Sequence, residues 1–290
     1  IEISAANDNS IFDGGGSAMA DTSSTGIIFL NGGVAVDTAW LDDNNSFLTI
    51  TFSDTIYTDQ AANNPVGISD FELIFTQTSN GNATNVTMES IKDNTGEVLP
   101  GGADTIRIYL NVIDVPNGYE KIKIKPLDDA SIYSLYGVPM FEIKTSEDVY
   151  LKDKLPPTIL ETNLQPNNNV SFASSERLFK NASENVDQNN FVFVFDNSAG
   201  GSTAQNVTIN SVATPLPGAL EFVYTLDLDI DPPPSGVETI YFKSNAVTPV
   251  YDHNNNVMID STELVTLNDK YPPSVEDSTI HESNNYVILT

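Results

Sequence analysis

The chain has 290 residues, 12 basic and 40 acidic side chains, a formal net charge of −28 and no cysteine. This charge argues against nucleic acid and anionic lipid as partners, no apolar run approaches the roughly 18–20 residues of a membrane span, and the lack of cysteine excludes disulfides and zinc–thiolate sites. A hydrophobic fraction of 40%, with 14 Phe and 11 Tyr, is sufficient for packed cores and excludes a wholly disordered chain.

Alternating apolar and polar residues predict short strands along the whole chain. They are residues 47–52, 71–75, 86–91, 106–110 and 121–125, followed by 191–195, 222–228 and 239–242. Turns rich in Gly, Asn and Pro, such as 80–82 and 100–102, separate them. Seven or eight strands in each stretch of roughly 120 residues are typical of a β-sandwich. We therefore predict an all-β fold.

Three segments recur in the same order, which indicates a tandem repeat. The pairs are 85–91 with 206–212, 116–122 with 234–240, and 151–157 with 267–273. The offset between the copies falls from 121 to 116 residues, as small loop deletions would produce.

The repeat divides the chain into four predicted ranges. Residues 36–157 and 158–273 are two complete repeats, residues 1–35 are the C-terminal part of a preceding repeat, and residues 274–290 are the first strand of a following one. A chain that ended inside a strand would leave an unpaired edge, so we expect the polypeptide to continue in both directions. Pro156-Pro157 ends one repeat, and a Pro-Pro pair favours extended backbone. We therefore predict a rod-like array.

Three turns carry a resemblance to a known family. Residues 10–19, 131–140 and 249–258 resemble the aromatic-Asp-x-x-Gly-Asn-x-Met turn of bacterial Ig-like repeats, although Ser134 replaces the family's Asp. The start Thr51–Asp54 resembles the same family. The resemblance implies tandem Ig-like β-sandwich domains of large secreted, S-layer-like or adhesin-like proteins, located outside the cell or on the bacterial cell surface. These motifs are structural and do not specify a ligand.

A catalytic constellation is not evident in the sequence. The histidines are His253 and His281, and the residue that matches His281 in the intact repeat is Asp42. A recurring Ser-His-Asp or His-metal site would require histidine in every copy. We therefore expect that the chain is not an enzyme.

Calcium is the cofactor that the acidic residues suggest, because Ca²⁺ takes 6–8 oxygen ligands. The candidate ligands are Asp227, Asp229 and Asp231 on one face of a strand, Asp252 in a turn with Asp13 at the corresponding earlier place, and the junction residues Asp153 and Asp269 with Glu161. A solvated strand face that blocks aggregation is the alternative interpretation of the first set.

Trp40 is the only tryptophan. An exposed Trp could stack on a sugar, but the residue at the matching position of the last partial repeat is Thr279, and a single Trp lacks companion rings. We therefore expect Trp40 to pack at the start of the first strand or against a neighbouring chain.

These observations favour a non-enzymatic structural region of a large bacterial cell-surface protein, which forms a rod or an assembled filament, sheath or S-layer. Its partners would be neighbouring copies of itself or adjacent repeats of the same chain. Lateral assembly would require the acidic charge to be offset by divalent ions or by interleaved lysines such as Lys121, Lys123 and Lys125. The alternative is an adhesin or a carbohydrate-binding region attached to a larger protein, with a surface glycan as partner.

Overall fold

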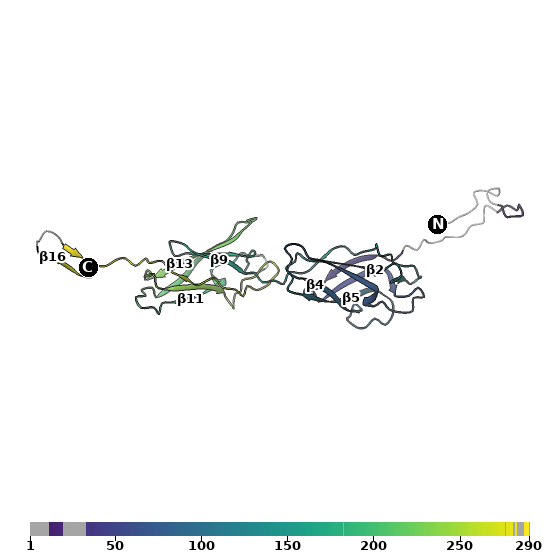
Figure 1. Cartoon of the computed structure of the whole chain (residues 1–290), viewed down its shortest axis with the longest axis horizontal. Coiled ribbons are helices and arrows are strands. Elements are labelled where there is room, and N and C mark those ends of the chain that lie inside the picture. The colour runs from purple at the N-terminus through teal and green to yellow at the C-terminus, as the bar shows by residue number, and fades with distance from the viewer. Residues whose placement is uncertain are drawn as a thin grey trace. The chain divides into compact units, whose positions relative to one another are not determined.

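A computed structural model describes residues 12–19, 33–181, 183–275, 277–280, 282 and 287–289. The chain divides into two compact units, Ile1–Asp153 and Lys154–Thr290, each built from antiparallel strands (Figure 1). In the part that is described, the helices are two short 3-10 turns, Ile68–Asp70 and Gln188–Asn190. None of the described helices is long and apolar enough to cross a membrane.

Unit 1 contains two antiparallel sheets. Its strands are β1 (Val36–Leu41), β2 (Phe47–Tyr57), β3 (Phe71–Thr76), β4 (Asn85–Lys92), β5 (Ala103–Ile113), β6 (Lys121–Pro126), β7 (Tyr133–Ser134) and β8 (Val149–Tyr150). The first sheet has the order β1-β2-β5-β4, and β7 also pairs with β2. The second sheet has the order β3-β6-β8.

Unit 2 repeats this order. Its strands are β9 (Ile159–Leu164), β10 (Val170–Ser174), β11 (Phe191–Asp196), β12 (Asn206–Ala213), β13 (Phe222–Asp231), β14 (Thr239–Ser244) and β15 (Val265–Thr266). One sheet has the order β9-β10-β13-β12 and the other β11-β14-β15. In both units the first, second, fifth and fourth strands therefore form one sheet. A separate hairpin joins β16 (Ser278–Ile280) to β17 (Val287–Leu289).

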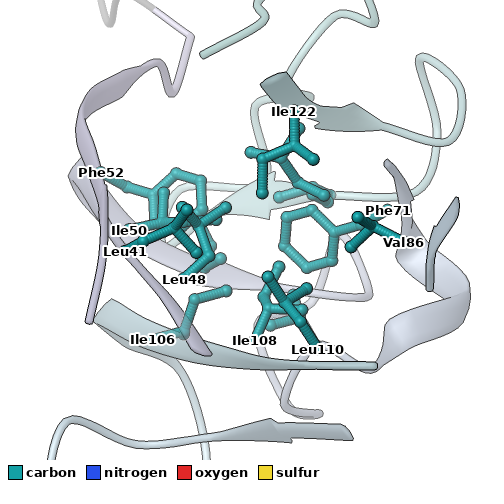
Figure 2. Close-up of a cluster of buried hydrophobic side chains, with 14 of the residues drawn as sticks. Leu41, Leu48, Ile50, Phe52, Phe71, Val86, Ile106, Ile108, Leu110 and Ile122 are labelled. Carbon is teal, nitrogen blue, oxygen red and sulfur yellow. The ribbon is translucent and has the colours of Figure 1, made fainter. Parts of the chain in front are cut away.

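The core of unit 1 lies between its two sheets. Leu48 and Ile50 of β2 pair with Ile108 and Ile106 of β5, and none of these side chains is exposed to solvent. Figure 2 shows them gathered with Ile122, which β6 contributes from the other sheet. Because both sheets bury their apolar faces in one cluster, the unit is a β-sandwich.

The core of unit 2 uses the same positions with larger rings. Phe172 of β10 pairs with Tyr224 of β13, and their rings stack with centroids 5.4 Å apart. The Tyr224 hydroxyl oxygen accepts a hydrogen bond from the backbone N–H of Leu178 (2.7 Å), which satisfies a buried polar group. Burial raises the pKa of the Tyr224 phenol, and this effect outweighs the Leu178 hydrogen bond, which lowers it.

The predicted all-β fold is confirmed, and each of the eight segments predicted as strands lies within an observed strand. The described part of unit 1 has eight strands, and unit 2 has seven besides the β16–β17 hairpin, which agrees with the predicted number. The four predicted ranges stay predictions. Most of residues 1–35, much of 274–290, and His281 lie outside the described residues.

Candidate functional site

A buried glutamate connects two loops in unit 1. Glu120, which directly precedes β6, is fully buried. Its Oε1 accepts hydrogen bonds from the backbone N–H groups of Asn82 and Ala83, both at 2.5 Å. Its Oε2 accepts a hydrogen bond from the N–H of Asn117 (3.2 Å). The carboxylate therefore joins the β3–β4 loop to the β5–β6 loop.

The same glutamate is present in unit 2. Glu238 is fully buried, and its Oε1 accepts from the N–H groups of Thr203 (2.8 Å) and Ala204 (2.9 Å). Its Oε2 accepts from the N–H of Ser235 (3.0 Å), and the Ser202 hydroxyl donates to Oε1 (3.1 Å). We refer to Glu120 and Glu238 as the glutamate brace.

The electrostatics of Glu238 fit a structural group. Burial by itself would raise its pKa, but the backbone N–H groups of Ala204 and Thr203, its own N–H and that of Ser235 outweigh burial and hold the pKa far below the usual range. Because N–H donors surround both oxygens, the carboxylate is oriented for holding loops rather than for binding a cation.

The brace has a signal in the sequence. Each glutamate ends a Pro-x-Gly-x-Glu segment that recurs between the units. Its glycine, Gly118 or Gly236, has a positive φ (+81° and +87°). A Cβ atom there would lie 3.4 Å from the Cβ of Asp153 and 3.2 Å from that of Asp269, respectively. Two of the three predicted junction residues, Asp153 and Asp269, therefore pack against the brace loop of their own unit.

A second repeated contact ties the turn of the first hairpin to the segment that follows β8 in unit 1 and β15 in unit 2. Asn45 donates from Nδ2 to the carbonyl oxygen of Lys152 (2.8 Å) and accepts from the N–H of Lys152 (2.7 Å). Asn168 makes the same two bonds with Asn268, at 3.0 and 2.6 Å. Both asparagines are buried and have a positive φ, +59° and +69°. Asparagine tolerates this conformation better than most residues do. We refer to Asn45 and Asn168 as the asparagine clamp.

The turns that hold two predicted calcium ligands share one geometry. The Oδ1 atom of Asp13 accepts from the N–H groups two and four residues later (2.8 and 2.9 Å), and the Oδ1 atom of Asp252 does the same (both 2.8 Å). The Ser134 hydroxyl replaces them in the third turn (both 3.2 Å). Hydrogen bonds from Ser17 and Gly15 lower the pKa of Asp13. In each turn a carboxylate or hydroxyl oxygen shapes the backbone.

The three predicted ligands on β13 lie on its outer side. Asp227 pairs with Ser211 across the sheet and accepts a hydrogen bond from Asn169 Nδ2 (3.1 Å), while Asp229 and Asp231 are further along the strand. Among the described residues, these three carboxylates do not form a group whose oxygens all lie within 4.8 Å of one another. Their role as calcium ligands stays a prediction.

The remaining candidates are on the surface. Glu161 of β9 is exposed and accepts a hydrogen bond from Asn163 Nδ2 (2.9 Å). His253 is exposed in its turn, with its ring centroid 5.8 Å from that of Phe179.

The packing of Trp40 within its own unit is only partial, and its expected packing against a neighbouring chain stays a prediction. Trp40 is 48% exposed on the outer face of the β1-β2-β5-β4 sheet, which is the side of that sheet away from the core. A hollow of about 630 Å³ lies beside it, and a second ring, Phe47, lines the same hollow. Trp40 and Phe47 are seven positions apart, but the hairpin between β1 and β2 brings their strands together. Phe47 is therefore the companion ring that Trp40 seemed to lack in the sequence.

Comparisons with known proteins give little further information. No protein-family profile and no curated protein sequence matches the chain. Among solved structures, the crystal structure of the S-layer protein rSbsC(31-844) is similar with a TM-score of 0.29 and 12% sequence identity. The similarity covers 88% of this chain and 28% of that chain. At this TM-score it supports neither a shared fold nor a shared function.

Proposed function

We propose that this chain is a non-enzymatic structural region of a large bacterial extracellular or cell-surface protein, composed of tandem Ig-like modules that assemble into a filament, sheath or S-layer. The observation that carries the proposal is repetition. The two units have the same strand order, the same glutamate brace and the same asparagine clamp. Repetition of a whole module is typical of proteins built to extend.

The strand order supports the Ig-like assignment. In the constant-type immunoglobulin sandwich, strands A, B, E and D form one sheet and strands C, F and G form the other. The orders β1-β2-β5-β4 and β3-β6-β8 correspond to these two sheets, with β7 as an addition, and β9 to β15 correspond in the same way. The turns that resemble bacterial Ig-like repeats support the cell-surface assignment.

The use of the polar residues supports a role without catalysis. Catalytic acids and bases sit in clefts with partners that adjust their pKa toward the working pH. The buried polar residues that the two units share hold loops instead. Glu238, for example, is kept ionised by backbone N–H groups and is fully buried, so a substrate would not reach it.

Surface labelling tests the location. An antibody raised against residues 36–273 is applied to intact and to permeabilised cells that produce the protein, with an antibody to a cytosolic protein as control. We expect gold particles on the surface of intact cells, arranged along a layer or filament. Labelling that requires permeabilisation would refute the proposal.

Calcium binding is a separate part of the proposal, and it rests on the acidic sequence. Bound Ca²⁺ would stabilise the folded units, by an amount that grows with the logarithm of its concentration above Kd. The test is thermal unfolding of the chain in EDTA, in about 2 mM CaCl₂ and in MgCl₂ at equal ionic strength. A Tm that rises with Ca²⁺ would support calcium binding, and identical curves would show that Ca²⁺ does not stabilise the units.

A further inference from the structure

We propose that the outer face of unit 1 binds an acidic saccharide, with a sugar ring stacked on Trp40 and its carboxylate held by Arg107. This site goes beyond the structural role. It does not depend on that role, because it uses residues of the outer face that contribute little to the shared core.

The hollow is large enough for a small ligand such as a sugar. Its volume of about 630 Å³ lies within the range of small-ligand sites, roughly 300–1,000 Å³. Across β1, β2 and β5, the register places Trp40 next to Thr49 and Thr49 next to Arg107. Thr49 is small and buried, so it forms the floor between two long side chains.

Aromatic rings form the apolar part of the site. Trp40, which is nearly half exposed, and Phe47 line the hollow, and Tyr109 supports Phe47 with their ring centroids 5.5 Å apart. The C–H face of a pyranose packs against such rings, which combine apolar area with little loss of side-chain freedom.

Charge distinguishes an acidic sugar from a neutral one. The Arg107 guanidinium lies 4.7 Å from the centre of the Phe47 ring, and within the described residues it makes no ion pair or hydrogen bond. The Lys92 ammonium lies 4.9 Å from the Tyr109 ring and likewise has no carboxylate partner there. Both cations therefore lie on one outer face, as cross-strand neighbours, in a chain of net charge −28.

The other lysines of unit 1 that lie on a sheet show the contrast. Lys121 and Lys123 pair with Asp148 at 2.5 and 3.2 Å, and Lys125 pairs with Glu72 at 2.9 Å. All three lysines therefore have carboxylate partners inside unit 1. Their predicted role in offsetting the charge of a neighbouring chain stays a prediction. Of the two cations without an ion pair among the described residues, Arg107 is the one that lines the hollow, and its guanidinium can make a bidentate contact with a ligand carboxylate.

Polar residues at the rim suit the hydroxyl groups of a sugar. Asp43 and Asn94 line the hollow and are exposed. Asp42 also lines it, but its Oδ1 already accepts from the N–H groups of Ser46 (2.6 Å) and Phe47 (3.0 Å). Asp43 would accept hydrogen bonds from hydroxyl groups, and Asn94 could both donate and accept.

Unit 2 provides an internal control at the same register. The row Trp40, Thr49, Arg107 and Lys92 of unit 1 corresponds to Asn163, Ser171, Thr225 and Ala213 of unit 2. The row in unit 2 therefore has neither an aromatic ring nor a cation. Binding should consequently belong to unit 1 alone.

The first experiment is a glycan array that contains uronate, sialylated and neutral oligosaccharides, probed with the full chain. Carboxylated glycans that bind are then titrated while tryptophan fluorescence is recorded. Trp40 is the only tryptophan, so a change in its emission reports contact at the proposed site. We expect saturable binding with a Kd below about 1 mM. Failure of every carboxylated glycan to bind, or equal binding of the neutral ones, would overturn the proposal.

Variants then assign the contacts by calorimetry. Trp40→Ala and Arg107→Gln should each weaken binding by about tenfold or more, and Arg107→Lys should lose less because the charge remains while the bidentate geometry is lost. Asn163→Ala and Thr225→Ala, the matched changes in unit 2, should leave Kd unchanged. Circular dichroism and Tm establish that each variant is folded. Unchanged glycan binding by a folded Trp40→Ala variant would contradict the site. The site would also be contradicted if the wild type bound no glycan but self-associated, and Trp40→Ala abolished that self-association.

Discussion

The two units place an aromatic pair on opposite sides of equivalent sheets. In unit 1 the pair is Phe47 and Tyr109, on the outer face, with ring centroids 5.5 Å apart. In unit 2 it is Phe172 and Tyr224, in the core, 5.4 Å apart. The inner positions of unit 1 are filled by isoleucines instead. The scaffold therefore tolerates changes of core volume, provided that the positions facing inward remain apolar.

The polar contacts behave in the opposite way. Glu120 and Glu238, and Asn45 and Asn168, keep both their chemistry and their bonding partners between the units. A buried polar group that lost one partner would be costly, whereas an outward side chain is free to change. The comparison indicates that the braces maintain the module and that the outer face distinguishes one copy from another.

The largest expected effect comes from the core of unit 2. Phe172→Ala should destabilise that unit by about 3–5 kcal/mol, because it removes a fully buried ring and leaves a cavity. Urea unfolding followed by NMR should show an earlier transition for residues of unit 2 and an unchanged one for residues of unit 1. A shift of equal size in both units would contradict two separate cores.

The glutamate brace gives the next largest effect. Glu238→Gln replaces a carboxylate with a group whose amide N–H faces backbone donors, and it should cost unit 2 about 2–3 kcal/mol. Glu120→Gln is the matched change and should affect unit 1 only. The measurement is the urea midpoint of each unit. If both substitutions were neutral, the glutamates would not brace the loops.

The same group makes unit 2 sensitive to acid. The pKa of Glu238 is lower in the folded than in the unfolded chain, so its contribution is complete above the unfolded value of about 4.3 and is lost as the pH falls toward the folded value. The stability difference between the wild type and Glu238→Gln should therefore shrink between pH 6 and pH 3, as read from urea midpoints. A difference independent of pH would be inconsistent with the depressed pKa.

The smallest effect is expected on the outer face. Phe47→Ala removes one ring of a cross-strand pair and should cost unit 1 only about 0.2–1 kcal/mol. Equilibrium unfolding of the full chain measures it, with Phe172→Ala as the reference for a buried ring. A loss as large as that of Phe172→Ala would place Phe47 in the core and undo the contrast between the two faces.

The strands were predictable because each side of the sandwich imposes a period of two. Residues 47–52 and 106–110 have the alternation that the core requires, and both lie in long strands. The edge strands β1 and β9 were not predicted from their own pattern. Val36–Leu41 and Ile159–Leu164 lie at sheet edges and bury few side chains, so their alternation is weak.

The candidate sites were less predictable, because they depend on register. Glu120 resembles a solvated loop acid in sequence, and only the fold shows that Ala83 reaches it from 37 positions away. Its recurrence as Glu238 was visible, but recurrence does not reveal burial. Trp40 seemed to be alone because Phe47 and Arg107 join it through strand pairing, which no local pattern contains.

Hydrogen exchange of the full chain tests most directly that each unit is held by its own glutamate brace. The backbone N–H groups of Ala83 and Ala204 lie in loops, and each donates to a buried glutamate. We predict that both exchange nearly as slowly as the strand amides of Ile50 and Phe172, since release requires the unit to open. Exchange of either loop amide at the rate of an exposed loop would contradict the account.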